Sequence, residues 1–195
     1  MLATLSATEV AFVMAGLMQG TLGIVWLVGG WAVGDARRAS VQWAAYAALS
    51  ALSFMLLVAG LRAAEPAQAE ALRAIGNLCG LAGLIALQRG IWLFTGAALE
   101  RRDHLFVLGV ALVASWIGLD PAAGYIRVSV FSCLLAWLCA GMARDLYRYG
   151  QGALRLRWPL LFGGAGFALR GLRALAQPAS VAAEMTTHSA LNVGS

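Results

Sequence analysis

The 195-residue chain contains no lysine and few charged residues of any kind. Its 14 basic residues are all arginine, Asp and Glu number 9, and charged residues make up only 12% of the chain, whereas 61% is hydrophobic. Soluble domains are about one-quarter charged, so this chain has too few polar residues to cover a surface in water. The mean hydropathy of +0.78 agrees with this. We therefore expect lipid to be the solvent for most of the chain.

Residues that commonly carry chemistry are also scarce. The two histidines lie far apart, and the three cysteines lie inside apolar runs without CxxC spacing. No serine lies in a GxSxG setting, and no pair of carboxylates lies within an apolar run. The sequence therefore predicts no enzyme activity in this chain, no metal site and no cofactor. The net charge of +5 is spread over short loops, so we expect no nucleic-acid partner.

Six apolar runs separated by short polar loops predict an all-α fold, a polytopic transmembrane helical bundle. The expected helices cover about residues 9–33, 41–61, 72–95, 104–119, 125–147 and 158–175. The fourth is short, because its length of roughly 24 Å falls below the ~30 Å hydrocarbon core. Together they form one transmembrane domain, and residues 176–195 follow as a polar tail.

The run at residues 72–95 is expected to be the centre of the bundle. Small residues and one leucine form one of its helical faces: Gly76, Gly80, Gly83, Leu87 and Gly90. A neighbouring backbone can approach such a face closely. The same run contains Arg89, and an arginine at membrane depth costs at least ~2.5 kcal/mol. We therefore expect Arg89 to point into the bundle or toward the lipid headgroups.

Arginine is concentrated in the loops on one side of the predicted bundle. That side holds Arg37, Arg38, Arg101, Arg102, Arg144, Arg148, Arg155 and Arg157. The positive-inside rule places it in the cytoplasm, so the chain is expected in a bacterial inner membrane with a periplasmic N-terminus. Six crossings are an even number, so the C-terminal end of the chain is also expected outside the cytoplasm. We therefore expect a seventh helix beyond residue 195, with the tail as its start; the alternative is that the tail is a disordered end.

Three stretches of this pattern resemble the N-terminal membrane sensory modules of bacterial GGDEF-type diguanylate cyclases. They read NLCGLAGLIALQRGIWLFTG, YIRVSVFSCLLAWLCAGMARDLYR and WPLLFGGAGFALRGLRAL, and the likeness covers roughly residues 10–195. The matching positions are Asn77, Gly83, the Arg89-Gly90 pair, Arg127, Arg170 and Leu172. The resemblance implies a signal-sensing domain that controls a cytoplasmic output domain.

The output domain itself is not in this chain, because the sequence contains no GGDEF motif. The resemblance implies that the full-length protein is a diguanylate cyclase in cyclic-di-GMP signalling and that it forms a homodimer. Similar helices also precede histidine kinases, so the class of output stays open.

Three arginines in the outer half of the bundle are candidates for a ligand site. Arg127 begins one expected helix there, and Arg170 and Arg173 end another. They could form a cationic pocket that binds a small anionic ligand or a lipid headgroup on the periplasmic side. Alternatively, they extend to headgroups or form structural ion pairs with nearby acids. Arg89 and Asn77 are further candidates, with helix-to-helix hydrogen bonding as their alternative role.

Two other classes of function stay open from the sequence. A small transporter or channel would need a continuous polar path across the bundle, and ion-coupled transporters carry acids buried in the membrane. Here every acid lies at a loop or near a helix end. A structural subunit without a ligand would instead have a tightly filled bundle.

Overall fold

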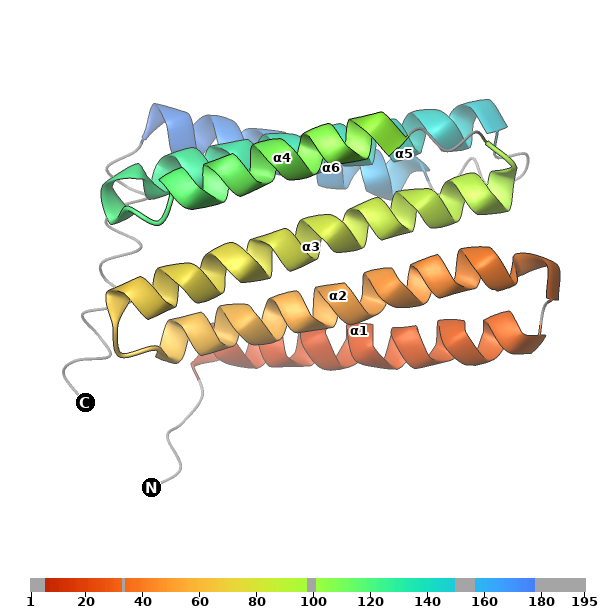
Figure 1. Ribbon diagram of the computed structural model, residues 1–195, viewed down its shortest axis with the longest axis horizontal. Coiled ribbons are helices and arrows are strands. Elements are labelled where there is room, and N and C mark those ends of the chain that lie inside the picture. The colour runs from red at the N-terminus through yellow and green to blue at the C-terminus, as the bar shows by residue number, and fades with distance from the viewer. Residues whose placement is uncertain (1–5, 33, 98–100, 150–156, 178–195) are drawn as a thin grey trace, which may run out of the picture.

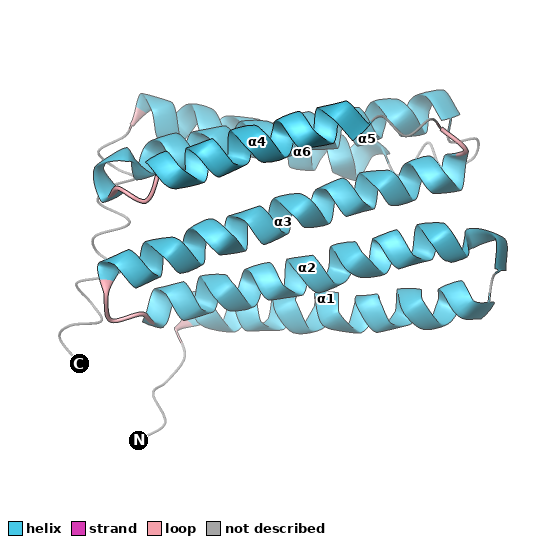
Figure 2. Cartoon of the chain, viewed as in Figure 1, coloured by secondary structure: helices cyan, strands magenta, loops and turns pink. Residues whose placement is uncertain are grey.

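The computed structural model describes residues 6–32, 34–97, 101–149 and 157–177, which are almost entirely helical (Figures 1 and 2). The helices are α1 (Ala7–Ala32), α2 (Arg37–Arg62), α3 (Pro66–Thr95), α4 (Arg101–Ile117), α5 (Gly124–Tyr149) and α6 (Arg157–Ala176). These ranges contain no strand, which confirms the all-α prediction. Arg155 and residues 178–195, the expected start of a seventh helix, lie outside the described residues.

Four of these helices, α1, α2, α3 and α5, are long and apolar enough to cross a membrane. The prediction of six membrane-spanning helices is therefore too high by this measure. α4 has only 17 residues, which corresponds to about 26 Å against a hydrocarbon core of ~30 Å. α6 has 20 residues, but its last two turns contain Arg170 and Arg173, which lower its hydropathy.

Local chemistry explains where the helices begin and end. α1 begins with a capping box, in which the Ser6 N–H donates to Glu9 Oε2 over 2.7 Å and the Glu9 N–H donates to Ser6 Oγ over 3.3 Å. α3 begins earlier than predicted because Pro66 is suited to a first helical turn. It ends at Thr95, as predicted, because Gly96 adopts the left-handed conformation with φ of 73°.

α3 lies at the centre of the helix packing. α2 lies between α1 and α3, α5 lies between α3 and α6, and α4 packs on α3 and α5. α1 and α6 therefore lie toward opposite edges of the molecule (Figure 1). In the most apolar stretch of α3, 44% of the residues are buried, compared with 11% in α1. The stretch at residues 72–95 is central, as the sequence predicts.

The small-residue face of α3 packs against α2. A Cβ atom at Gly76 would lie 3.2 Å from the carbonyl oxygen of Ser53, and one at Gly90 would lie 2.3 Å from Trp43 Nε1. Glycine at these positions therefore lets the two helices approach closely.

The molecule consists of two well-packed helix groups joined by a smaller contact. α1, α2 and α3 form one group, α5 and α6 form the other, and α3 meets α4 and α5 over a smaller area, which we call the α3–α4–α5 junction. Buried apolar side chains fill the middle of this junction: Leu81, Ile85, Val107, Ala111, Phe131 and Leu138. Buried polar groups lie toward its two ends.

Candidate functional site

A buried carboxylate lies at the arginine-rich end of the α3–α4–α5 junction. Asp145 of α5 is 5% exposed. Its Oδ2 accepts hydrogen bonds from Trp92 Nε1 at 2.6 Å and from Gln88 Nε2 at 3.2 Å, both on α3. Its Oδ1 lies 3.4 Å from Nε of Arg144, whose side chain is 58% exposed. Three donors thus compensate for burial of this carboxylate and tie α3 to α5.

His104, at the start of α4, extends this network to a third helix. Its Nε2 lies 3.1 Å from Gln88 Oε1, and its ring stacks on Trp92 with the centroids 4.9 Å apart. A carboxylate only accepts hydrogen bonds, so the Gln88 amide nitrogen faces Asp145 and its oxygen faces His104. With this orientation of the amide, the contact needs a proton on His104 Nε2, which donates it to Gln88 Oε1. We call these four residues the Asp145 cluster.

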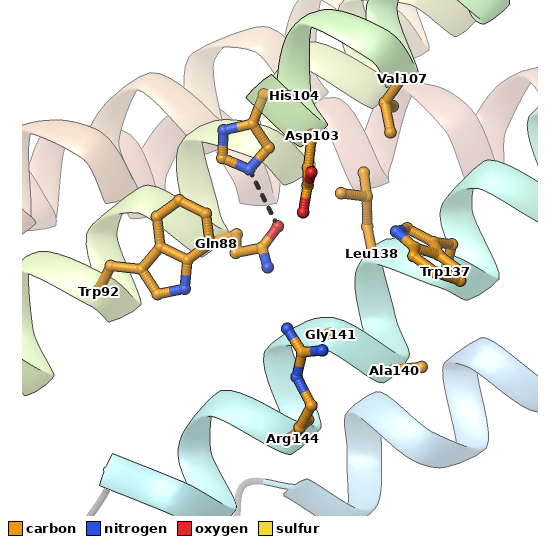
Figure 3. A pocket seen from close by; sticks show the side chains of 10 residues that line it. All are labelled: Gln88, Trp92, Asp103, His104, Val107, Trp137, Leu138, Ala140, Gly141 and Arg144. Atoms are coloured by element: carbon orange, nitrogen blue, oxygen red, sulfur yellow. Dashed lines mark hydrogen bonds between the residues drawn. The ribbon is translucent and has the colours of Figure 1, made fainter. Parts of the chain in front are cut away.

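A cavity of about 170 Å³ lies beside the Asp145 cluster (Figure 3). It is lined by Gln88, Trp92, Asp103, His104, Val107, Trp137, Leu138, Ala140, Gly141 and Arg144. The carboxylate of Asp103 and the guanidinium of Arg144 both point into it, from α4 and from α5 (Figure 3). Gly141 lies close to the cluster, because a Cβ atom there would lie 3.1 Å from Gln88 Nε2.

A second buried cluster lies at the other end of the junction. Arg127 of α5 is 1% exposed and forms an ion pair with Glu70 of α3. Its Nη1 donates a hydrogen bond to the carbonyl oxygen of Gly118 over 2.8 Å, while its buried Nε has no partner. Glu70 also accepts a hydrogen bond from Arg73 Nη1 at 2.5 Å. We call this group the Glu70 cluster.

An apolar layer separates the two clusters. On α3, Leu81 and Ile85 lie between Glu70 and Gln88 in the chain, and both belong to the buried apolar core. On α5, Phe131 and Leu138 lie between Arg127 and Asp145 and belong to the same core. Two polar ends with an apolar middle suit a helical protein that crosses a bilayer.

The structure does not bring the three candidate arginines together. Arg127 faces α3 and the end of α4, where it contacts Glu70 and Gly118. α6 packs on another side of α5, with Gly171 against Ser132, and its Arg170 and Arg173 are exposed. The ligand role of these arginines stays a prediction.

Arg89 and Asn77 both lie on α3 and are half-buried. Arg89 directly follows Gln88 of the Asp145 cluster, but it does not line the cavity there. Asn77 lies along the part of α3 that carries the glycine face, next to Gly76. Their ligand role also stays a prediction.

Sequence reasoning missed the Asp145 cluster. Trp92 is 6% exposed and donates a hydrogen bond to a carboxylate, a contact that the sequence does not indicate. Asp145 was expected as an acid near a helix end, and it is buried. One signal was present, since Leu138, Met142 and Asp145 share one helical face and the first two are buried core residues.

Donor groups for a metal are not gathered in the described part of the chain. In those residues, no group of three or more His, Cys, Asp or Glu could hold a metal ion. Cys79, Cys133 and Cys139 are free thiols. No family model, curated protein or solved structure matches this chain.

Proposed function

We propose that this chain is a membrane-embedded sensory domain that controls a cytoplasmic output domain. The observation that carries the proposal is the α3–α4–α5 junction, where a cavity lies directly against the Asp145 cluster. The junction is the smaller contact between two well-packed helix groups. If the two helix groups can adopt two arrangements, a ligand that binds one arrangement more tightly would shift the equilibrium toward that arrangement. The resemblance of the helices favours a diguanylate cyclase as the output domain and a homodimer as the assembly.

In this proposal all six helices lie across a bacterial inner membrane. α4 and α6 are included because both pack along α5, which is itself long and apolar enough to cross. The excess of arginine in the loops beside the Asp145 cluster supports a cytoplasmic position for that end. The Glu70 cluster and the start of α1 then lie at the periplasmic end.

Exposed Arg170 and Arg173 remain the proposed contacts for a small anion or a lipid headgroup on the periplasmic side. Arg127 is a poorer choice, because its guanidinium is buried against Glu70. The test is Arg170→Ala in the full-length protein, which should change the output signal while membrane insertion is retained. An unchanged output and an unchanged ligand response would remove Arg170 from the site.

The sensory assignment is tested by reading the gene past codon 195 and assaying its product. We expect a GGDEF or kinase domain to follow. For a GGDEF domain, full-length protein should raise cyclic-di-GMP in a host cell, and the 195-residue chain alone should not. A gene that continues into no signalling domain would refute the proposed control of an output.

A small transporter or channel is the alternative. Burial of Glu70 and Asp145 favours it, since buried acids are typical of ion-coupled transporters. The apolar layer between the two clusters argues against it, because the buried apolar side chains of that layer offer no ligands to an ion. Purified protein in liposomes should therefore give no more proton, ion or amino-acid flux than empty liposomes. Flux above that background would favour transport.

A further inference from the structure

Two opposite charges point into the cavity beside the Asp145 cluster without neutralising each other. Asp103 comes from α4 and Arg144 from α5, and both side chains point into the same space (Figure 3). In the described part of the chain, Asp103 and Arg144 form no ion pair with each other, whereas Arg144 uses its Nε for Asp145 Oδ1. The terminal nitrogens Nη1 and Nη2 of Arg144 thus remain for another acceptor.

The remaining walls of the cavity are aromatic and apolar. Trp92 and Trp137 contribute indole rings, and Val107 and Leu138 contribute aliphatic surface. The volume of about 170 Å³ is close to that of a cavity of ~150 Å³ that binds benzene. The site therefore suits a molecule of about six to eight heavy atoms with a short apolar part.

We propose that this cavity binds a small zwitterionic amino acid. Its ammonium group would lie against Asp103, and its carboxylate would accept two hydrogen bonds from Nη1 and Nη2 of Arg144. A short side chain would pack against Val107 and Leu138. The role of this ligand as a stimulus rests on the proposed sensory function. Its binding does not, because binding is measured on the chain without any output domain.

The charges around the cavity favour a zwitterion over a simple ion. An anion would lie near the carboxylates of Asp103 and of buried Asp145. A cation would lie near the guanidinium of Arg144. Only a ligand with both charges, separated by a few bonds, places each one against its complement.

The experiment measures equilibrium binding to the purified chain in lipid nanodiscs. The probes are L-alanine, propionate, which lacks the ammonium group, and ethylamine, which lacks the carboxylate. We expect saturable binding of alanine and binding of each single-charge analogue that is weaker by about tenfold or more. Asp103→Asn and Arg144→Gln should each weaken alanine binding by a similar factor.

Matched control variants are Asp120→Asn and Arg148→Gln. Asp120 lies in the turn after the opposite end of α4, and exposed Arg148 lies one turn beyond Arg144 on α5, outside the cavity. Both should bind alanine like the unmodified chain.

Propionate or ethylamine binding as tightly as alanine would overturn the proposal, as would no saturable binding of alanine, glycine, serine or proline to folded protein. Binding without any effect on output would instead refute only the sensory function.

Discussion

At the scale of single residues, Asp145 shows how an acid is stabilised inside an apolar helix bundle. Its carboxylate is buried, but donors from Trp92, Gln88 and Arg144 surround it. Those donors come from α3 and from the neighbouring turn of α5, so the acid is stable only while the helices stay together. The hydrogen bonds of this network are directional, so they fix the arrangement of α3, α4 and α5 more specifically than apolar packing alone would.

Asp145→Ala should destabilise the chain strongly. Trp92 Nε1 and Gln88 Nε2 would remain buried without an acceptor, which we expect to lower the free energy of unfolding by about 2–4 kcal/mol. Arg144→Ala should cost less than about 1 kcal/mol, since its side chain is 58% exposed. Unfolding in detergent, followed by tryptophan fluorescence, measures both. Equal effects would contradict the central position of Asp145.

The ion pair between Glu70 and Arg127 should show strong coupling. Removing one partner leaves the other charge buried, so Glu70→Leu or Arg127→Met alone should each cost about 3–5 kcal/mol. The double variant should cost clearly less than the sum of the single variants. Arg62→Met is the control, because Arg62 pairs with Glu9 from a 47% exposed position, and this variant should cost clearly less than Glu70→Leu or Arg127→Met. Additive single effects would show that the pair is not coupled.

At the scale of helices, some of the packing could be predicted and some could not. The glycine face of α3 is visible in the sequence because its residues recur at helical spacing and lack bulk, and that face packs on α2. The alternative role of Arg127, an ion pair with a nearby acid, is confirmed by Glu70, whereas the partners of Asp145 were not visible. A buried polar contact between helices depends on their rotation and depth, which hydropathy does not encode. The ends of α4 and α6 were predicted closely. The prediction that both helices span a membrane is not supported by their length and hydropathy.

Gly90→Ala tests the contact of α3 with α2. The new methyl group would lie 2.3 Å from Trp43 Nε1, and the Trp43 ring is held by Trp26 and Phe94, with centroids 4.6 Å and 5.6 Å away. The tryptophan must shift, which should cost about 1–3 kcal/mol in thermal unfolding. Gly109→Ala on α4 meets no atom within 4 Å and should be neutral or stabilising by up to ~1 kcal/mol. A neutral Gly90→Ala would mean that this face is loosely packed.

At the scale of the whole molecule, the contacts between helices are unevenly distributed. Within each helix group the contacts are extensive, whereas the α3–α4–α5 junction is smaller and contains the cavity and both polar clusters. In the proposed sensory function, a ligand in the cavity would move one group against the other without unfolding either. The composition alone predicted a membrane protein, but nothing in the pattern of arginines indicated a cavity at the arginine-rich end.

The most direct test of the sensory account fills the cavity in the full-length protein. Gly141→Leu places a side chain where Gln88 and the ligand space lie, and Gly163→Leu on α6 is the control because a Cβ atom there meets nothing within 4 Å. Cyclic-di-GMP is measured in cells at equal amounts of membrane-inserted protein. We predict that Gly141→Leu shifts the level away from that of both the unmodified protein and Gly163→Leu. Three indistinguishable levels would contradict control of the output through the α3–α4–α5 junction.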